Sequence, residues 1–141
     1  MKHKLFILVP VLVWLSAVPT HAHHSFSATY FEDKVQKIEG NLVQFLYRNP
    51  HSFVHVVAPD DTGAMQRWAI EWGAGLQLGQ QGVTRDSLHA GDHVVIEGNP
   101  GRNPADHRLR MRTILRPSDG WKWSGTFQLG AADAFERERR C

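Results

Sequence analysis

Short stretches of alternating apolar and polar residues constrain the fold of this chain more than any other feature. In the clearest one, Ser52, Val54 and Val56 alternate with Phe53 and His55. A β-strand places successive side chains on opposite faces, so this pattern predicts a strand with one buried face. Patterns of the same kind, separated by turn-forming residues, predict strands at residues 35–47, 52–58, 65–72, 93–98 and 109–115.

A short glycine-interrupted stretch at residues 73–82 separates the third and fourth predicted strands. Leu76 and Leu78 suit one or two helical turns, which Gly82 would close. Five strands with a helical segment between the third and fourth are the order of an OB-fold, a small five-stranded barrel. We therefore predict an all-β, OB-like barrel. A five- or six-stranded sandwich is the alternative.

The N-terminus has the features of a secretory signal peptide. Lys2 and Lys4 precede an apolar run at residues 5–18, and Thr20 and Ala22 supply the small residues before a cleavage site. The run is shorter than the ~20 residues that a transmembrane helix needs. We expect residues 1–22 to be removed, leaving a periplasmic protein that begins at His23. An uncleaved anchor is the alternative.

Three regions follow from these boundaries: the signal peptide at 1–22, the barrel with an extended N-terminal arm at 23–116, and a tail at 117–141. Loss of Lys2 and Lys4 leaves 14 Lys and Arg against 14 Asp and Glu, because the whole chain has 16 of the former. A balanced charge of this kind argues against general nucleic-acid binding. We expect no nucleic-acid partner, no membrane attachment after cleavage, and a small ligand or a protein as partner.

Several motifs resemble a family of small exported Gram-negative bacterial proteins that is classed as a domain of unknown function. They are His23-His24-Ser25-Phe26, Asn49-Pro50-His51, and the run Thr84-Arg85-Asp86-Ser87-Leu88 leading to Gly91-Asp92. The resemblance covers roughly residues 22–116. It implies a periplasmic address and an OB-like barrel, and it implies no activity or catalytic residues.

The histidines suggest a metal site. A terminal histidine binds a transition metal through its α-amine and ring, and copper has the highest affinity for such nitrogen ligands. We predict a site formed by His23, His24, His51 and His55. His51 and His55 are about 13 Å apart along a strand at ~3.3 Å per residue, so they share a site only if the strand bends or the arm bridges them. The alternatives are that His51 braces its loop and that the arm is frayed.

An aromatic and arginine surface gives a competing interpretation. OB-folds commonly bind ligands across their second and third strands. Trp68 and Trp72, with Arg108, Arg110 and Arg112, would then hold an anionic ligand or a protein partner. The alternative is that Trp68 belongs to the core and that the arginines are a solvated strand face.

Catalysis has little support in the sequence. Glu71 and Glu97 are single carboxylates without an obvious partner, and no serine lies in a nucleophile-elbow context. The one cysteine, Cys141, has no second cysteine with which to form an intrachain disulfide. We therefore expect a binding protein and not an enzyme.

Overall fold

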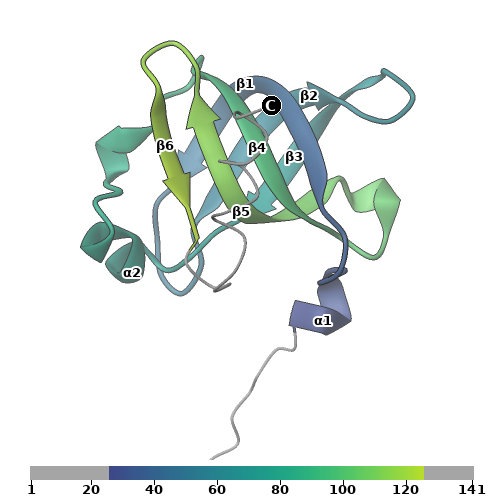
Figure 1. Cartoon of the computed structure of the whole chain (residues 1–141), viewed down its shortest axis with the longest axis horizontal. Helices are drawn as coiled ribbons and strands as arrows, with labels where there is room; N and C mark the ends of the chain where they lie inside the picture. The colour runs from purple at the N-terminus through teal and green to yellow at the C-terminus, as the bar shows by residue number, and fades with distance from the viewer. Residues whose placement is uncertain (1–25, 126–141) are drawn as a thin grey trace, which may run out of the picture.

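The computed structural model of the chain describes residues 26–125 as a closed β-barrel (Figure 1). The predicted signal peptide, His23, His24 and Cys141 lie outside the described residues. In chain order the elements are α1 (Phe26–Thr29), β1 (Gln36–Leu46), β2 (Phe53–Pro59), β3 (Met65–Glu71), α2 (Gly75–Gln80), the 3-10 turn η1 (Arg85–Ser87), β4 (His93–Pro100), the 3-10 turn η2 (Pro104–Asp106), β5 (Arg108–Arg116) and β6 (Trp121–Ser124).

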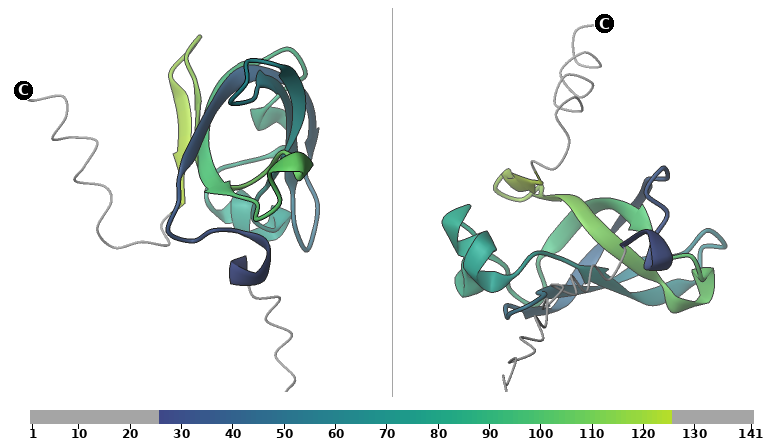
Figure 2. Two further views of the ribbon diagram at one scale, coloured as in Figure 1. Left: turned by 90° about the vertical axis from the view of Figure 1, so that its right-hand side faces the viewer. Right: turned by 90° about the horizontal axis from the view of Figure 1, so that it is seen from below.

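The strands follow the order β3-β2-β1-β4-β5-β6, and a parallel pairing between β3 and β5 closes the barrel. Figure 2 (left) shows the closed ring of strands, with α1 at one end. The other strand pairs are antiparallel. Five strands closed in this way, with α2 between β3 and β4, confirm the predicted OB-fold.

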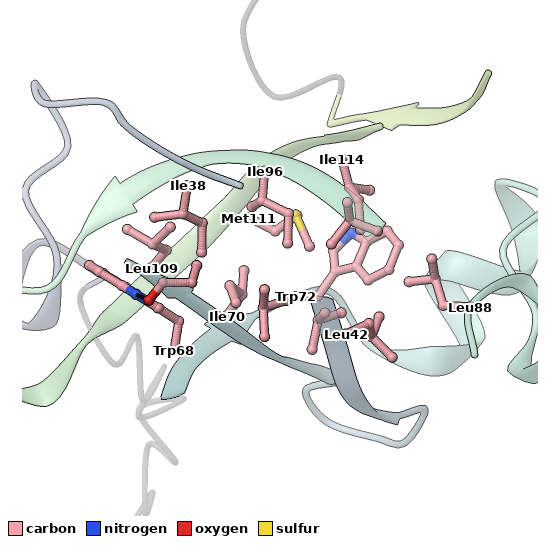
Figure 3. Packing of buried hydrophobic residues seen from close by; sticks show 14 of the residues in the cluster. Ile38, Leu42, Trp68, Ile70, Trp72, Leu88, Ile96, Leu109, Met111 and Ile114 are labelled. Atoms are coloured by element: carbon pink, nitrogen blue, oxygen red, sulfur yellow. Dashed lines mark hydrogen bonds between the residues drawn. The ribbon is translucent and has the colours of Figure 1, made fainter. Parts of the chain in front are cut away.

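The inward side chains of the barrel form one apolar core (Figure 3). In β2, Val54, Val56 and Ala58 are fully buried, and the residues between them are partly exposed. This is the alternation that the sequence predicted for a strand with one buried face. Other strands, α2 and the segment between α2 and β4 complete the core, with Ile38, Leu42, Trp68, Ile70, Trp72, Leu78, Val83, Leu88, Val94, Ile96, Leu109, Met111 and Ile114.

Gly40 lets the long strand β1 pass close to β2. A Cβ atom on Gly40 would lie 2.1 Å from the carbonyl oxygen of Val57, a distance that no side chain tolerates. The register between β1 and β2 shifts between Leu42 and Gln44, a few residues further along β1.

The sheet continues beyond Arg116, where the sequence placed the end of the barrel domain. β6 pairs antiparallel with β5, and Trp121 and Trp123 pack against the core. The indole of Trp123 also lies edge-on to that of Trp72, with ring centroids 4.9 Å apart. Apolar side chains on a four-residue strand thus extend the domain into the segment expected to be a tail.

The extended N-terminal arm that the sequence predicted contains a helical turn in its described part. Residues 26–29 form one helical turn, closed by a hydrogen bond from the Tyr30 amide to the Phe26 carbonyl (2.7 Å). Tyr30 then bridges to Gly101, and the Phe31 amide donates to the Pro100 carbonyl at 2.9 Å. The turn therefore delivers Tyr30 to the barrel.

Candidate functional site

Glu71, the last residue of β3, is the centre of a polar cluster at one end of the barrel. Its Oε1 lies 3.2 Å from Nδ1 of His51, and its Oε2 accepts a hydrogen bond from the Tyr30 hydroxyl at 2.6 Å. Arg108 lies 3.7 Å from the same Oε2. The carboxylate side chain is only 13% exposed. One largely buried carboxylate therefore joins three distant segments of the chain.

Strand pairing brings these side chains together. Ile70 points into the core, so its neighbour Glu71 points outward. Glu71 is opposite Phe53 on β2 and opposite Arg110 on β5, in the parallel pairing that closes the barrel. The cluster thus forms where β2, β3 and β5 meet.

His51 is positioned by the loop that precedes β2. Within this loop the peptide bond between Asn49 and Pro50 is cis. The buried Ser52 hydroxyl donates to the Arg48 carbonyl at 3.1 Å, and the Arg48 amide donates back to it at 3.2 Å. Arg48 Nε also donates to the His51 carbonyl. These bonds fix the His51 backbone, while its side chain stays 44% exposed and open to a ligand.

The phenol of Tyr30 acts as a hydrogen-bond donor to Glu71. Burial raises the pKa of Tyr30 above its ordinary value, and the hydrogen bond and charge of Glu71 raise it further. The phenol therefore keeps its proton throughout the physiological pH range. With Tyr30 on Oε2, the other carboxylate oxygen faces His51.

Phe26 places the start of the described chain beside His51. Its ring lies edge-on to the His51 imidazole, with centroids 6.3 Å apart, and the Arg110 guanidinium lies 3.6 Å from its ring centroid. Arg102 holds the same turn, because its Nε donates to the Ser27 carbonyl at 2.6 Å and its amide to that of Thr29 at 2.9 Å.

The predicted ligands His23 and His24 lie just before this turn, outside the described residues. Phe26 follows His24 by two positions and His23 by three. A chain extends by at most ~3.3–3.6 Å per residue, so the His23 backbone is within about 11 Å of the Phe26 backbone. The docked turn places Phe26, the first residue that the structure describes, beside His51.

His55 lies on the outer face of β2, apart from this cluster. Its ring stacks on Phe53, with centroids 6.5 Å apart. Burial lowers the pKa of His55, and the positive charges of Arg67 and Arg48 lower it further, which favours the neutral form of the ring. The contacts found among residues 26–125 do not bring His55 to His51.

Trp68 and Trp72 belong to the core, which corrects the interpretation that they line a ligand surface. Each is only 4% exposed. Trp68 donates through Nε1 to the Ala58 carbonyl at 3.2 Å, and Figure 3 shows both indoles among the aliphatic side chains. Alternation along β3 turns Trp68 and Ile70 inward, and Trp72 continues that face past the end of the strand.

The three arginines of β5 alternate with core residues and point outward. Arg108 contacts Glu71 and lies near the Tyr30 ring, and Arg110 covers Phe26. Arg112 lies further along the same outer face. At least two of these arginines therefore hold the N-terminal segment on the barrel.

Sequence reasoning missed Tyr30 as a functional residue and treated Glu71 as an isolated carboxylate. Their contact spans 41 positions in the chain, so no local spacing in the sequence predicts it.

The described residues contain no group of three or more His, Cys, Asp or Glu side chains that could hold a metal. A metal site at His51 would need further ligands from outside residues 26–125. In the described part of the chain, no helix is long and apolar enough to span a membrane.

A comparison with protein-family models gives a match over most of the chain. A profile described as a family of unknown function (DUF6152) matches residues 11–110. This range includes the predicted N-terminal histidines, the Asn49-Pro50-His51 motif and Glu71. A search of curated proteins gives no match.

A solved structure with a similar barrel is the mitochondrial single-stranded DNA binding protein Rim1 from S. cerevisiae. The match covers 57% of this chain and 90% of the yeast chain, with 16% identity and a TM-score of 0.42. Our exclusion of nucleic acid as a partner is wrong. It rested on the balanced charge alone, and a protein with a similar barrel is a single-stranded DNA binding protein. At this identity the likeness concerns the fold alone and assigns no ligand.

Proposed function

Because this chain belongs to DUF6152, a family of unknown function, its role has to be argued from its own residues, and we propose that it is an exported, periplasmic metal-binding protein. The metal is a transition metal, with copper as the preferred one, and the mature N-terminus and His51 bind it. The protein works by binding and not by catalysis.

The contact between His51 and Glu71 is the observation that carries this proposal. Histidines that bind metals commonly donate their second ring N–H to a carboxylate, which fixes the tautomer and makes the free nitrogen a better ligand. Nδ1 of His51 faces Glu71 at 3.2 Å, so its Nε2 is the nitrogen that would bind the metal.

His93 provides an informative contrast. It is similarly exposed, at 49%, and it also faces a carboxylate, with Nε2 2.9 Å from Glu39. Its Nδ1, however, lies 3.1 Å from the side-chain oxygen of Asn41. Both ring nitrogens are therefore engaged, and His93 has no lone pair to offer a metal without losing a partner.

The remaining ligands would come from the mature N-terminus. Cleavage after Ala22 would free the α-amine of His23, and that amine with the His23 ring and His51 Nε2 would give three nitrogen ligands. His24 offers a second mode, through the amine, a deprotonated amide and its own ring. Nitrogen ligands of this kind favour copper among the divalent first-row metals. Docking of Phe26 against His51 supports a shared site.

Export and processing form the first test, because the proposed site needs a free amine at His23. Mass spectrometry of protein recovered from the periplasm should give a chain that lacks residues 1–22. A full-length chain, or a different N-terminus, would contradict the proposed ligand set.

Copper titration of the processed protein forms the second test. His51→Ala should weaken binding, and so should an extra residue placed before His23, since each removes one ligand group. His93→Ala is the matched control and should leave the affinity unchanged. Equal affinities for the wild type, His51→Ala and the extended protein would rule out the shared site.

A further inference from the structure

A hollow of about 470 Å³ opens between α2 and the loop before β2. The loop residues that line it precede Pro50, whereas His51 follows Pro50. In Figure 1, α2 stands out from one side of the barrel. The hollow is lined by Tyr47, Arg48, Asn49, Gly75, Leu76, Gly79, Gln80 and Arg85. None of these residues belongs to the proposed metal site.

Hydrogen bonds between residues 75–76 of α2 and residues 47–49 of the loop before β2 fix the shape of the hollow. The Gly75 amide donates to the Arg48 carbonyl at 2.9 Å, and the Leu76 amide donates to the Asn49 side chain at 3.2 Å. The Tyr47 hydroxyl donates to the Gly75 carbonyl. A Cβ on Gly75 would lie 3.0 Å from the Tyr47 ring, so the ring packs closely against the glycine backbone. A site formed in advance loses less entropy when a ligand binds.

Two positive charges line the hollow without an acidic partner. No carboxylate among residues 26–125 forms an ion pair with Arg48 or Arg85. Arg116 shows the opposite case, since it contacts Asp92 at 2.8 Å and Asp119 at 2.9 Å. The lining contains no Asp or Glu either. Its electrostatic potential therefore favours an anion.

Each of the two guanidinium groups lies over an aromatic ring. Arg48 lies over the Phe53 ring at 5.3 Å, and Arg85 over the Tyr47 ring at 5.6 Å. Arg48 Nε also donates to the His51 carbonyl at 3.2 Å, so its terminal N–H groups, together with the N–H edge of Arg85, remain for a ligand. That edge matches the two oxygens of a carboxylate or phosphate.

Leu76 adds an apolar element to the lining. Its side chain is 72% exposed, and it is part of the same hollow as the two arginines. We propose that this hollow binds a small organic oxyanion, a carboxylate or phosphate monoester that carries an apolar group. The arginines bind the charged end, and Leu76 with the Tyr47 ring contacts the apolar end. The residues that bind the anion are not ligands of the proposed metal site, although Arg48 also donates to the His51 carbonyl.

Titration of the processed chain with phenyl phosphate, benzoate, inorganic phosphate and phenol tests the proposal, with calorimetry as the readout. Phenyl phosphate or benzoate should bind more tightly than inorganic phosphate, and phenol should not bind. Which of the two binds more tightly distinguishes a phosphate from a carboxylate ligand. Arg48→Gln and Arg85→Gln should each weaken binding about tenfold, because each removes a charge-assisted hydrogen bond.

Arg67→Gln is the matched control, because Arg67 lies on β3, outside the hollow, and also forms no ion pair among the described residues. It should change the affinity less than twofold. The proposal is overturned if no anion binds, or if Arg67→Gln weakens binding as much as Arg85→Gln. Should Arg48→Gln fail to fold, Arg85→Gln decides the question. His51→Ala should leave anion binding intact, so failure of the metal site and failure of this site are distinguishable.

Discussion

The hydroxyl of Tyr30 lies 2.6 Å from Oε2 of Glu71 and joins the N-terminal segment to the end of β3. Tyr30 is buried, and the carboxylate that it contacts also faces His51. The residue that docks the N-terminal segment thus shares its acceptor with the histidine of the candidate site. The docking of the N-terminal segment on the barrel and the orientation of the His51 ring therefore depend on the same carboxylate.

Tyr30→Phe removes this hydrogen bond and leaves Oε2 of Glu71 without it. A hydrogen bond to a charged group contributes about 1.5–3 kcal/mol, so we expect the free energy of unfolding to fall by about 2 kcal/mol. Urea denaturation measures the loss. Tyr47→Phe is the control, because Tyr47 donates to the uncharged Gly75 carbonyl, and it should cost about 1 kcal/mol. If Tyr30→Phe lowers the free energy of unfolding less than Tyr47→Phe does, the hydrogen bond from the Tyr30 phenol to Glu71 does not contribute as proposed.

The two core tryptophans should respond differently to replacement by phenylalanine. Both substitutions remove similar volume. Trp68 donates to the Ala58 carbonyl, whereas Nε1 of Trp72 is buried and has no hydrogen-bond partner among residues 26–125. Trp68→Phe should therefore destabilise the barrel by about 1 kcal/mol more than Trp72→Phe. Guanidinium denaturation compares the two, and the reverse order would contradict this assignment of the indole N–H groups.

Asp60 makes the turn between β2 and β3 sensitive to acid. Its carboxylate accepts hydrogen bonds from the side chain and amide of Thr62, the Gln66 side chain and the Ala64 amide, which lower its pKa to about 2. A pKa depressed in the folded state gives stability that is present above pH 4 and is lost as the pH falls toward 2.

Asp60→Asn should therefore be less stable than the wild type at pH 7, and the difference should narrow between pH 4 and pH 2. Thermal unfolding across this range measures the narrowing, and NMR titration of the Asp60 carboxyl should give a midpoint near 2. A midpoint at the ordinary value for aspartate would contradict the hydrogen-bonded turn.

Gly40→Ala tests the close approach of β1 to β2. The new Cβ would lie 2.1 Å from the Val57 carbonyl oxygen, so the strands would have to separate. We expect a loss of about 3 kcal/mol or more in unfolding free energy, or failure to fold. Gly73→Ala is the control, because its nearest atom is the end of the flexible Gln77 side chain at 3.2 Å, and it should cost less than about 1 kcal/mol. Equal costs would contradict the contact.

The sequence predicted the barrel well because its strands alternate. In β2 the alternate residues Val54, Val56 and Ala58 are buried, and in β4 the alternate residues Val94 and Ile96 are buried. The position of α2 between β3 and β4 followed from two leucines and the surrounding glycines. β6 escaped prediction because four residues, Trp121–Ser124, carry too little pattern, and their pairing with β5 depends on contacts across the fold.

The candidate site was predicted less completely. The motif Asn49-Pro50-His51 singled out His51, but the partner Glu71 is brought to it by strand pairing, which local spacing does not reveal. Trp68 and Trp72 were suspected of binding a ligand because aromatic residues suit both a core and a surface. Which face of β3 and of its continuation carries the two side chains decides between a core position and a surface position. The arginine row of β5 contacts the N-terminal segment, a role that no charge pattern indicates.

Electron paramagnetic resonance of the copper-loaded, processed protein tests the central claim most directly. Two terminal histidines bind copper on their own, so affinity alone does not identify His51 as a ligand. If His51 is a ligand, the nitrogen couplings of His51→Ala should differ from those of the wild type, and those of His93→Ala should match it. Identical spectra for the wild type and His51→Ala would show that the terminus binds copper without the barrel and would contradict the proposed site.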